Sequence, residues 1–295
     1  MNKISNVKVT ALHGIKENTV TVDFLPKKPM SFVYGFNGIG KTTVFNLLTA
    51  ALNKDFEILQ KIKFETIEIK FEDKEIFIFK KDKSLIELKY KDRVISVFDL
   101  LKKNDAVLIK DAEQVFEKLN HNLTINLLLC DEYYKTTKLN KLKFKENKNI
   151  REKECEVFED VISNPGLTDK YIGINRKTGE LEITGKFGKK EYKGLKTDIL
   201  SQGEKNLLLL YYHLIFEVPK TLDDDSVYIQ LIDTPETSLH VDSLITFYDN
   251  LCYINDELGR NENFQFVIAT HSPAITYNHN ELMRGMRRKN NVESK

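Results

Sequence analysis

The stretch VYGFNGIGKTTVFNLL, residues 33–48, contains the turn around which the rest of the sequence can be organised. It continues a run of β-forming residues, MSFVY at 30–34, and three glycines then fall within six residues. A lysine and two threonines follow the third glycine, and the apolar residues of 42–52 recur with helical spacing. The pattern predicts a buried strand, a tight glycine-rich loop and a helix, in that order.

Residues 35–42 match G-x-x-x-x-G-K-[ST] at every fixed position, with the strand before and the helix after that a phosphate-binding loop requires. Small residues let successive backbone N–H groups turn toward phosphate oxygens, and a helix N-terminus adds partial positive charge. Lys41 would reach the β- and γ-phosphates of a nucleotide, while the hydroxyl of Thr42 would bind Mg²⁺. The alternative is a glycine-rich turn that fits by chance, and the flanking strand and helix count against it. The residues expected to contact the nucleotide here are Gly35, Asn37, Gly38, Gly40, Lys41, Thr42 and Thr43.

Composition narrows the class of protein. The 295 residues suffice for one large domain or two small ones, and 45 basic against 44 acidic side chains leave a formal charge of +1, so no global field favours nucleic acid or membrane. Three cysteines at 130, 155 and 252 form neither a CxxC motif nor a Cys/His cluster, which favours free thiols in a reducing compartment over zinc. The longest apolar run, about 207–216, is roughly half of the ~20 residues that a membrane span needs. We expect a soluble, cytoplasmic protein without a membrane partner.

Strand and helix patterns alternate at both ends of the chain and predict an α/β core with a mainly parallel sheet. Residues 62–95 alternate apolar and polar side chains, which predicts an antiparallel meander with one wet face. Residues 97–163 are rich in Lys and Glu and predict a short, mainly helical insertion, without the sustained heptads of a long coiled coil. A hairpin is expected over 171–184. We expect one domain over 1–295, with a nucleotide-binding core formed by 1–60 and 195–280.

Three further motifs follow the glycine loop. Leu200–Glu204, LSQGE, opens an apolar helix at 201–217, and its Ser-x-x-Glu spacing is also that of an ordinary capping box. The apolar strand VYIQLID ends in Asp233, a carboxylate placed to hold Mg²⁺ directly or through water. The strand FQFVIAT is followed by His271, at the edge of the predicted sheet where ligands bind, although a lone histidine there is often structural.

The order of these four motifs resembles that of ATP-binding-cassette (ABC) ATPases. Within that superfamily the chain is similar to the branch with the SMC and RecF proteins, the OLD-type ATPases and the ATPase subunits of phage-defence systems such as PARIS and Septu. PETSLH, residues 235–240, resembles the DEPExxLH of that branch, and ATHSP replaces the plain histidine switch of transporter cassettes. The resemblance covers roughly 1–60 and 195–280 and implies an α/β ABC ATPase head with an antiparallel β subdomain.

The resemblance also implies how such a head works. Two copies would pair head to tail around two ATP molecules, so that Ser201, Gly203 and Glu204 of one copy face the phosphates bound at Lys41 of the other. Mg²⁺ would be held by Thr42 and Asp233. The expected function is that of an ATPase that senses or regulates within a phage-defence or DNA-maintenance complex, with a separate effector protein such as a nuclease. Contact with DNA and an oligomer larger than a dimer stay open.

The chain departs from the family where the family usually has a glutamate directly after the strand-ending aspartate. That position is Thr234, and the next carboxylate, Glu236, follows Pro235. A hydroxyl cannot take a proton from water as a carboxylate can, so either hydrolysis is slow or Glu236 substitutes. The residues expected at the reaction centre are Lys41, Asp233, Glu236 and His271. The family's Q-loop glutamine has two candidates, Gln60 and Gln114.

Other interpretations remain. A transporter cassette would share the motifs, but the ATHSP sequence and the missing glutamate disfavour it. A hydrolysis-deficient scaffold stabilised by ATP would share them too, and only a turnover measurement separates it from a slow ATPase. The lysines of 135–145 could contact phosphates, but neighbouring glutamates make a solvated helical face the alternative. The same alternative applies to Arg284, Arg287, Arg288 and Lys289.

Overall fold

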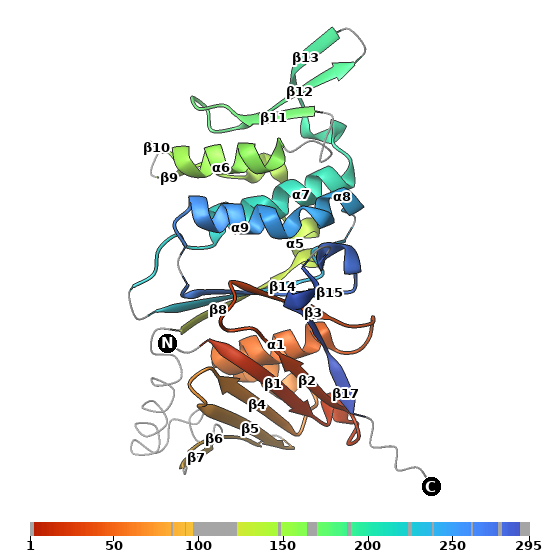
Figure 1. Ribbon diagram of the computed structural model, residues 1–295, viewed down its shortest axis with the longest axis vertical. Helices are drawn as coiled ribbons and strands as arrows, with labels where there is room; N and C mark the ends of the chain where they lie inside the picture. Colours follow the sequence, from red (N-terminus) through yellow and green to blue (C-terminus); the bar gives the residue numbers. More distant parts are fainter. Residues whose placement is uncertain are drawn as a thin grey trace.

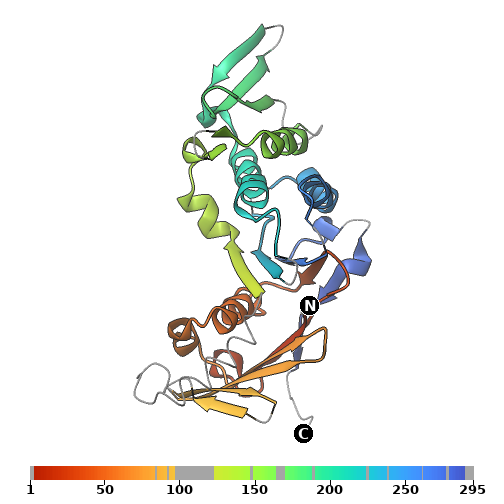
Figure 2. The ribbon, with the colours of Figure 1, turned by 90° about the vertical axis from the view of Figure 1, so that its left-hand side faces the viewer.

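A parallel five-stranded sheet lies in the middle of an elongated molecule, and the other elements stack in layers on either side of it (Figures 1 and 2). The computed structural model describes residues 3–83, 85–91, 93–96, 123–146, 149–163, 170–187, 190–223, 226–237, 239–260, 262–276 and 279–289. The central sheet has the order β16-β3-β15-β14-β8, and each of its pairings is parallel. Its strands are β3 (Met30–Tyr34), β8 (Leu123–Leu129), β14 (Val227–Asp233), β15 (Phe264–Thr270) and β16 (Met283–Gly285).

The central strands are buried on both faces, which explains their continuous apolar sequences. Along β14, Ile229 and Leu231 belong to one buried cluster, whereas Tyr228 and Ile232 belong to another on the opposite face. The first cluster contains helix α1 (Lys41–Leu52), which lies between the central sheet and a second sheet (Figure 1). The molecule therefore has two hydrophobic cores that share the central sheet as a wall.

The second sheet has seven strands in the order β17-β2-β1-β4-β5-β6-β7, all antiparallel. Its strands are β1 (Ile4–Thr10), β2 (Thr19–Asp23), β4 (Thr66–Phe71), β5 (Ile76–Asp82), β6 (Leu85–Tyr90), β7 (Arg93–Ser96) and β17 (Arg287–Lys289). The alternation in the sequence has the expected effect, since β4 is buried at every second residue. Strand β1, within the range 1–60 expected to belong to the nucleotide-binding core, pairs with β4 of this meander, and β2 pairs with β1.

The other face of the central sheet carries a layer of helices, and a small antiparallel sheet, β11-β12-β13, lies beyond it at the far end of the molecule (Figure 1). Helix α2 (Phe56–Lys61) follows α1 and packs in the same core as α1. The helices on the other face are α5 (Cys130–Thr136), α6 (Glu152–Ile162), α7 (Gln202–Tyr212), α8 (Val241–Ile245) and α9 (Phe247–Glu257). A π-helical turn, η4 (His213–Glu217), continues α7. The small sheet contains β11 (Lys170–Ile174), β12 (Leu181–Phe187) and β13 (Lys190–Leu195). The remaining elements are η1 (Leu12–Gly14), η2 (Leu139–Lys141), β9 (Lys145–Glu146), β10 (Asn149–Ile150), η3 (Thr197–Ile199), η5 (Pro273–Thr276) and η6 (Asn280–Leu282).

The predicted fold class is confirmed: an α/β fold with a parallel sheet, an antiparallel sheet and short helices. Within the described residues no helix is longer than the 12 residues of α1, so no long coiled coil is present there. In the same part of the chain, no helix combines the length and the apolar character that crossing a membrane would require.

The expected helical insertion over 97–163 is wrong in one respect. Residues 97–122 lie outside the described residues, but Leu123–Leu129 forms β8, an edge strand of the central sheet, before α5 and α6 begin. The sequence LTINLLL is a seven-residue apolar run, and periodicity alone cannot assign such a run to helix or strand. The parallel core thus takes a strand from outside the ranges 1–60 and 195–280. The expected hairpin at 171–184 likewise has a third strand, β13, whose polar sequence KEYKGL gave no signal.

Candidate functional site

The carboxyl ends of four parallel strands meet at one edge of the central sheet, and each is followed by polar residues. In the strand register Thr270 lies beside Tyr34, Asp233 beside Ala269, and Leu129 beside Asp233. The glycine loop, Asp233, His271 and the start of α5 therefore all leave the sheet at the same edge. Open parallel sheets bind their ligands at this edge.

The glycine loop turns from β3 into α1 through backbone angles that favour glycine. Gly38 has φ 79° and Gly40 has φ 105°. A Cβ atom on Gly40 would lie only 2.7 Å from Leu12 Cδ2, so both conformation and space require glycine there. Gly40 is also the N-cap of α1 and has no side chain to cap it. The first N–H groups of α1 are thus left for an anion, as expected of a phosphate-binding loop.

The side chain of Lys41 folds back onto the glycine loop. Its Nζ donates to the carbonyl oxygens of Gly35, at 2.5 Å, and of Phe36, at 3.3 Å. The residue is buried, and burial lowers the pKa of its ammonium group, while Asp233 and Glu236 act in the opposite direction. Phosphate oxygens would be stronger partners for this ammonium than neutral carbonyls, so the lysine is placed to exchange one for the other.

Thr42 and Asp233 form a close side-chain contact between α1 and β14. The Thr42 hydroxyl donates to Asp233 Oδ2 at 2.5 Å. The other oxygen, Oδ1, is buried and has no hydrogen-bond partner. Burial raises the pKa of the Asp233 carboxyl, and this outweighs the opposing effects of Thr42 and Lys41. Asp233 Oδ1 is therefore a buried oxygen that could bind a cation.

This donor set fits Mg²⁺, which prefers hard oxygen ligands and is commonly held by one or two side chains together with nucleotide phosphates and water. Within the described residues no three His, Cys, Asp or Glu side chains are grouped as a metal site, so the protein alone would not complete the coordination. Thr42 and Asp233 would supply the protein ligands. Bound there, the ion would neutralise phosphate charge.

Glu236 and His271 are joined by two contacts. Glu236 Oε1 accepts the backbone N–H of His271 at 2.7 Å and lies 2.9 Å from His271 Nδ1. The Thr270 hydroxyl donates to the same oxygen at 2.9 Å. Glu236 is buried and its Oε2 has no hydrogen-bond partner, whereas the His271 side chain is 45% exposed. A carboxylate on Nδ1 favours the proton on that nitrogen and leaves Nε2 facing away from it, toward the open edge.

Thr234, between Asp233 and Pro235, adopts φ 52°, in the left-handed region. A β-branched residue is strained there, at a cost of about 1–3 kcal/mol. Its N–H donates to Ala269 O at 2.9 Å, and its carbonyl accepts from the Thr237 hydroxyl at 3.2 Å. The strained turn directs the chain from the strand end toward Glu236, whose side chain returns to the sheet edge.

Ser201, Gly203 and Glu204 lie elsewhere, at the N-terminus of α7, which packs on the opposite face of the central sheet from α1. Here both halves of a capping box are present: Ser201 Oγ accepts from the N–H of Glu204 at 3.2 Å, and Glu204 Oε2 accepts from the N–H of Ser201 at 2.7 Å. The capping-box interpretation is therefore correct locally. It does not exclude a second role, since the end of the helix stays exposed at Ser201 and Gln202.

Of the two Q-loop candidates, Gln114 falls outside the described residues. Gln60 is exposed on α2, which follows the C-terminal end of α1, the end away from the glycine loop. On the side of β14 away from β15 lies β8, and Cys130 and Asp131 follow the end of β8 at the edge of the sheet that carries the site. The charge of Asp131 acts on Asp233 and contributes to raising its pKa. Sequence analysis missed Asp131 because it missed β8.

Comparison with known proteins gives the family. Residues 86–276, well over half of the chain, match the family model described as "AAA domain, putative AbiEii toxin, Type IV TA system". No curated protein matches the chain.

Among solved structures, an SMC head bound to the C-winged helix domain of ScpA has 13% sequence identity and a TM-score of 0.54, with 99% of this chain and 98% of that chain covered. The SMC head domain from Thermotoga maritima has 11% identity and a TM-score of 0.51, with 96% and 94% covered. At such low identity the similarity shows the fold alone, which is that of SMC heads. The chain belongs to the AAA-domain family of that description, that of the AbiEii-type proteins.

Proposed function

We propose that this protein binds Mg²⁺–ATP at the edge of its central sheet and hydrolyses it slowly. The observation that carries the proposal is the contact of Thr42 with Asp233, with one Asp233 oxygen buried and unpaired next to Lys41. A hydroxyl, a carboxylate and an ammonium at the start of an uncapped helix form the set of groups that a metal-bound triphosphate needs. Gly35, Asn37, Gly38, Gly40 and Thr43 would supply backbone and side-chain contacts around the phosphates.

Slow hydrolysis follows from how Glu236 is held. One of its oxygens already accepts hydrogen bonds from Thr270 and His271, so the carboxylate is committed to positioning His271. Thr234, at the place where the family has a carboxylate, cannot act as a general base near neutral pH. His271 would then contact the terminal phosphate or the attacking water through Nε2. The protein would spend most of its cycle with ATP bound.

We further propose that ATP joins two copies head to tail. The glycine loop covers one side of the phosphates, and a second helix N-terminus carrying a hydroxyl is a suitable anion site for the other side. Ser201 and Gly203 of a second copy would provide it. Because the nucleotide would bridge the interface, dimerisation should depend on ATP.

The dimer would act as the sensor or regulator of a complex whose effector is a separate protein, in phage defence or DNA maintenance. Two findings support a protein partner: the family description refers to a toxin of a toxin–antitoxin system, and a similar SMC head was solved bound to ScpA. Whether the effector is a nuclease, and whether DNA is bound, would follow from the components that copurify.

One experiment tests the core of the proposal. Binding of a fluorescent ATP analogue is measured with and without Mg²⁺ for the wild-type protein and for Lys41→Met, and molar mass is followed by light scattering. We expect Mg²⁺-dependent binding, loss of binding in the variant and a doubled mass with ATP. Tight binding by Lys41→Met would contradict the phosphate site, and an unchanged mass would contradict the dimer.

A further inference from the structure

The N-terminus of α7 is held from outside by the small sheet. Lys170, the first residue of β11, lies with its Nζ 2.9 Å from Glu204 Oε1. Both side chains are largely buried, with 14% and 12% of their surface exposed. The second oxygen of Glu204 is the one that accepts from the N–H of Ser201 in the capping box. One carboxylate thus connects Lys170 to Ser201.

The charge of Glu204 matters because of where it lies. A helix N-terminus attracts anions through its partial positive charge and its free N–H groups, and a carboxylate in the first turn cancels much of that attraction. An incoming phosphate would also be repelled by Glu204 directly. The ammonium of Lys170 neutralises the carboxylate while its capping hydrogen bond is kept. With Lys170 in place, the helix end keeps both its cap and its affinity for an anion.

We propose that Lys170 is a positioning residue for the interface between two copies: it neutralises Glu204 so that the N-terminus of α7 can accept the phosphate of a nucleotide bound by the other copy. The inference rests on the ATP-dependent dimer proposed above. It adds a residue 34 positions from Glu204 that none of the sequence motifs contains.

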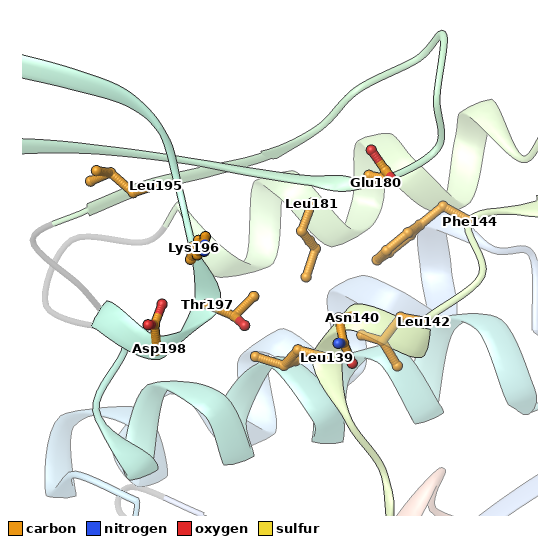
Figure 3. A pocket seen from close by; sticks show the side chains of 10 residues that line it. All are labelled: Leu139, Asn140, Leu142, Phe144, Glu180, Leu181, Leu195, Lys196, Thr197 and Asp198. Atoms are coloured by element: carbon orange, nitrogen blue, oxygen red, sulfur yellow. The ribbon is translucent and has the colours of Figure 1, made fainter.

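The small sheet is connected through the chain both to Lys170 and to the N-terminus of α7. Its first strand begins with Lys170, and its last strand runs through η3 directly into Ser201. Beneath β12 and β13 the sheet is separated from the helical layer by a cavity of about 400 Å³ (Figure 3). The cavity is lined by Leu139, Asn140, Leu142, Phe144, Glu180, Leu181, Leu195, Lys196, Thr197 and Asp198. Two ion pairs connect the small sheet to the helices: Lys170 pairs with Glu204, and Arg176 pairs with Glu159. In the second pair, Arg176 Nη2 lies 2.6 Å from Glu159 Oε2. Any shift of the sheet would therefore act on Lys170 and Ser201 together.

The test uses four variants of the full chain: Lys170→Met, Lys170→Arg, Glu204→Gln and the double variant Lys170→Met/Glu204→Gln. For each, thermal melting without nucleotide, affinity for a fluorescent ATP analogue and the ATP-dependent dimer dissociation constant are measured. Lys170→Met should bind nucleotide as the wild type does but dimerise at least about tenfold more weakly, because Lys170 would no longer balance the charge of Glu204 near the phosphate. Lys170→Arg should restore most of the dimerisation, since it retains the charge.

The double variant separates charge from structure. Glutamine at this position still completes a capping box, so the double variant should dimerise within a few-fold of the wild type. Glu204→Gln alone removes the negative charge and keeps Lys170, so this variant should dimerise more tightly than the wild type, most clearly at low salt. These two variants keep the test decisive even if Lys170→Met melts early.

Two results would overturn the inference while leaving the dimer intact: Lys170→Met and Glu204→Gln both dimerising as the wild type does, or a well-folded double variant as weak as the single one. A wild-type protein that binds ATP but stays monomeric would instead refute the proposed dimer, and this inference with it.

Discussion

The hydroxyl of Thr42 donates a hydrogen bond to Asp233 over 2.5 Å, although 191 positions separate the two residues in the chain. The contact joins the first turn of α1 to the end of β14. Both ends are fixed by the central sheet, because β14 pairs with β15 and β15 with β3. The proposed Mg²⁺ ligands are therefore assembled by the fold before any nucleotide arrives.

Replacing Asp233 by Asn should stabilise the protein in the absence of nucleotide and Mg²⁺. Burial raises the pKa of Asp233 above its ordinary value of 3.8, so the folded protein favours the protonated form, and ionisation at higher pH costs stability. Asparagine keeps an acceptor for Thr42 without the charge, and we expect a gain of about 1 kcal/mol at pH 7. The gain should shrink as the pH falls and vanish well below 3.8, where Asp233 is protonated in both the folded and the unfolded state. Urea unfolding at several pH values measures it, and a pH-independent difference would contradict the explanation.

Glu236 and His271 should act as one unit in hydrolysis. Glu236→Gln weakens the orientation of the imidazole, and His271→Ala removes it, so each change should lower the rate constant for ATP hydrolysis by about 10–100-fold with little effect on ATP affinity. Because Glu236 would act through its contacts with His271, the double variant should be no slower than the slower single variant. Single-turnover assays decide the point. Fully multiplicative losses would mean that Glu236 acts independently, as a base in its own right.

Replacing Thr234 by Glu should accelerate hydrolysis. A carboxylate directly after Asp233 would be placed to orient or deprotonate water, an effect of about 10²-fold where general-base catalysis operates. Thr234→Gln is the matched control, since it has the same length and cannot accept the proton. Equal rates for the two variants would show that the residue at this position does not limit turnover. The positive φ of Thr234 is kept in both variants, so strain does not distinguish them.

Arg260 should be a major contributor to stability while lying outside the nucleotide site. Its guanidinium is buried and donates to the carbonyl oxygens of Pro219, Val218 and Leu214 and to the side chain of Asn255. Burial lowers the pKa of Arg260 to about 10. Arg260→Ala leaves buried acceptors unpaired, and we expect a loss of about 3 kcal/mol or more.

Arg260→Lys should recover only part of this loss, because an ammonium cannot reach acceptors spread around a planar guanidinium. ATP affinity measured well below the melting temperature should not change in either variant, since Arg260 precedes the start of β15 at the edge of the sheet away from the glycine loop. A stable Arg260→Ala protein would show that water satisfies these carbonyls.

The parts of the fold and of the candidate site that could be predicted are those encoded by patterns within a short stretch of sequence. The glycine loop has fixed spacing within eight residues, and the buried strands β3, β14 and β15 are continuous apolar runs, so the loop, Asp233 and His271 could all be placed at one sheet edge in advance. The fold class followed from the same runs. The strand β8 was missed because its short apolar sequence lies inside a polar, helix-forming region.

Contacts between distant residues could not be predicted in the same way. The pairing of Glu236 with His271 depends on the register between β14 and β15 and on the unusual backbone of Thr234. The ion pair of Lys170 with Glu204 depends on where the small sheet packs, and no spacing in the sequence encodes that. Lys170 and Glu204 are two among many charged residues, which make up 30% of the chain, so neither stands out in the sequence.

The position of β3 in its sheet has a consequence for biosynthesis. This strand and its phosphate loop emerge from the ribosome early, but both strands that flank it, β15 and β16, come from residues 264–285. A nascent chain that ends before residue 264 therefore carries the glycine loop on a strand with two open edges, which invites pairing with other chains. Such a chain lacks the two strands that hold β3 in its sheet, so we expect it to bind no ATP until residues 264–285 have been made.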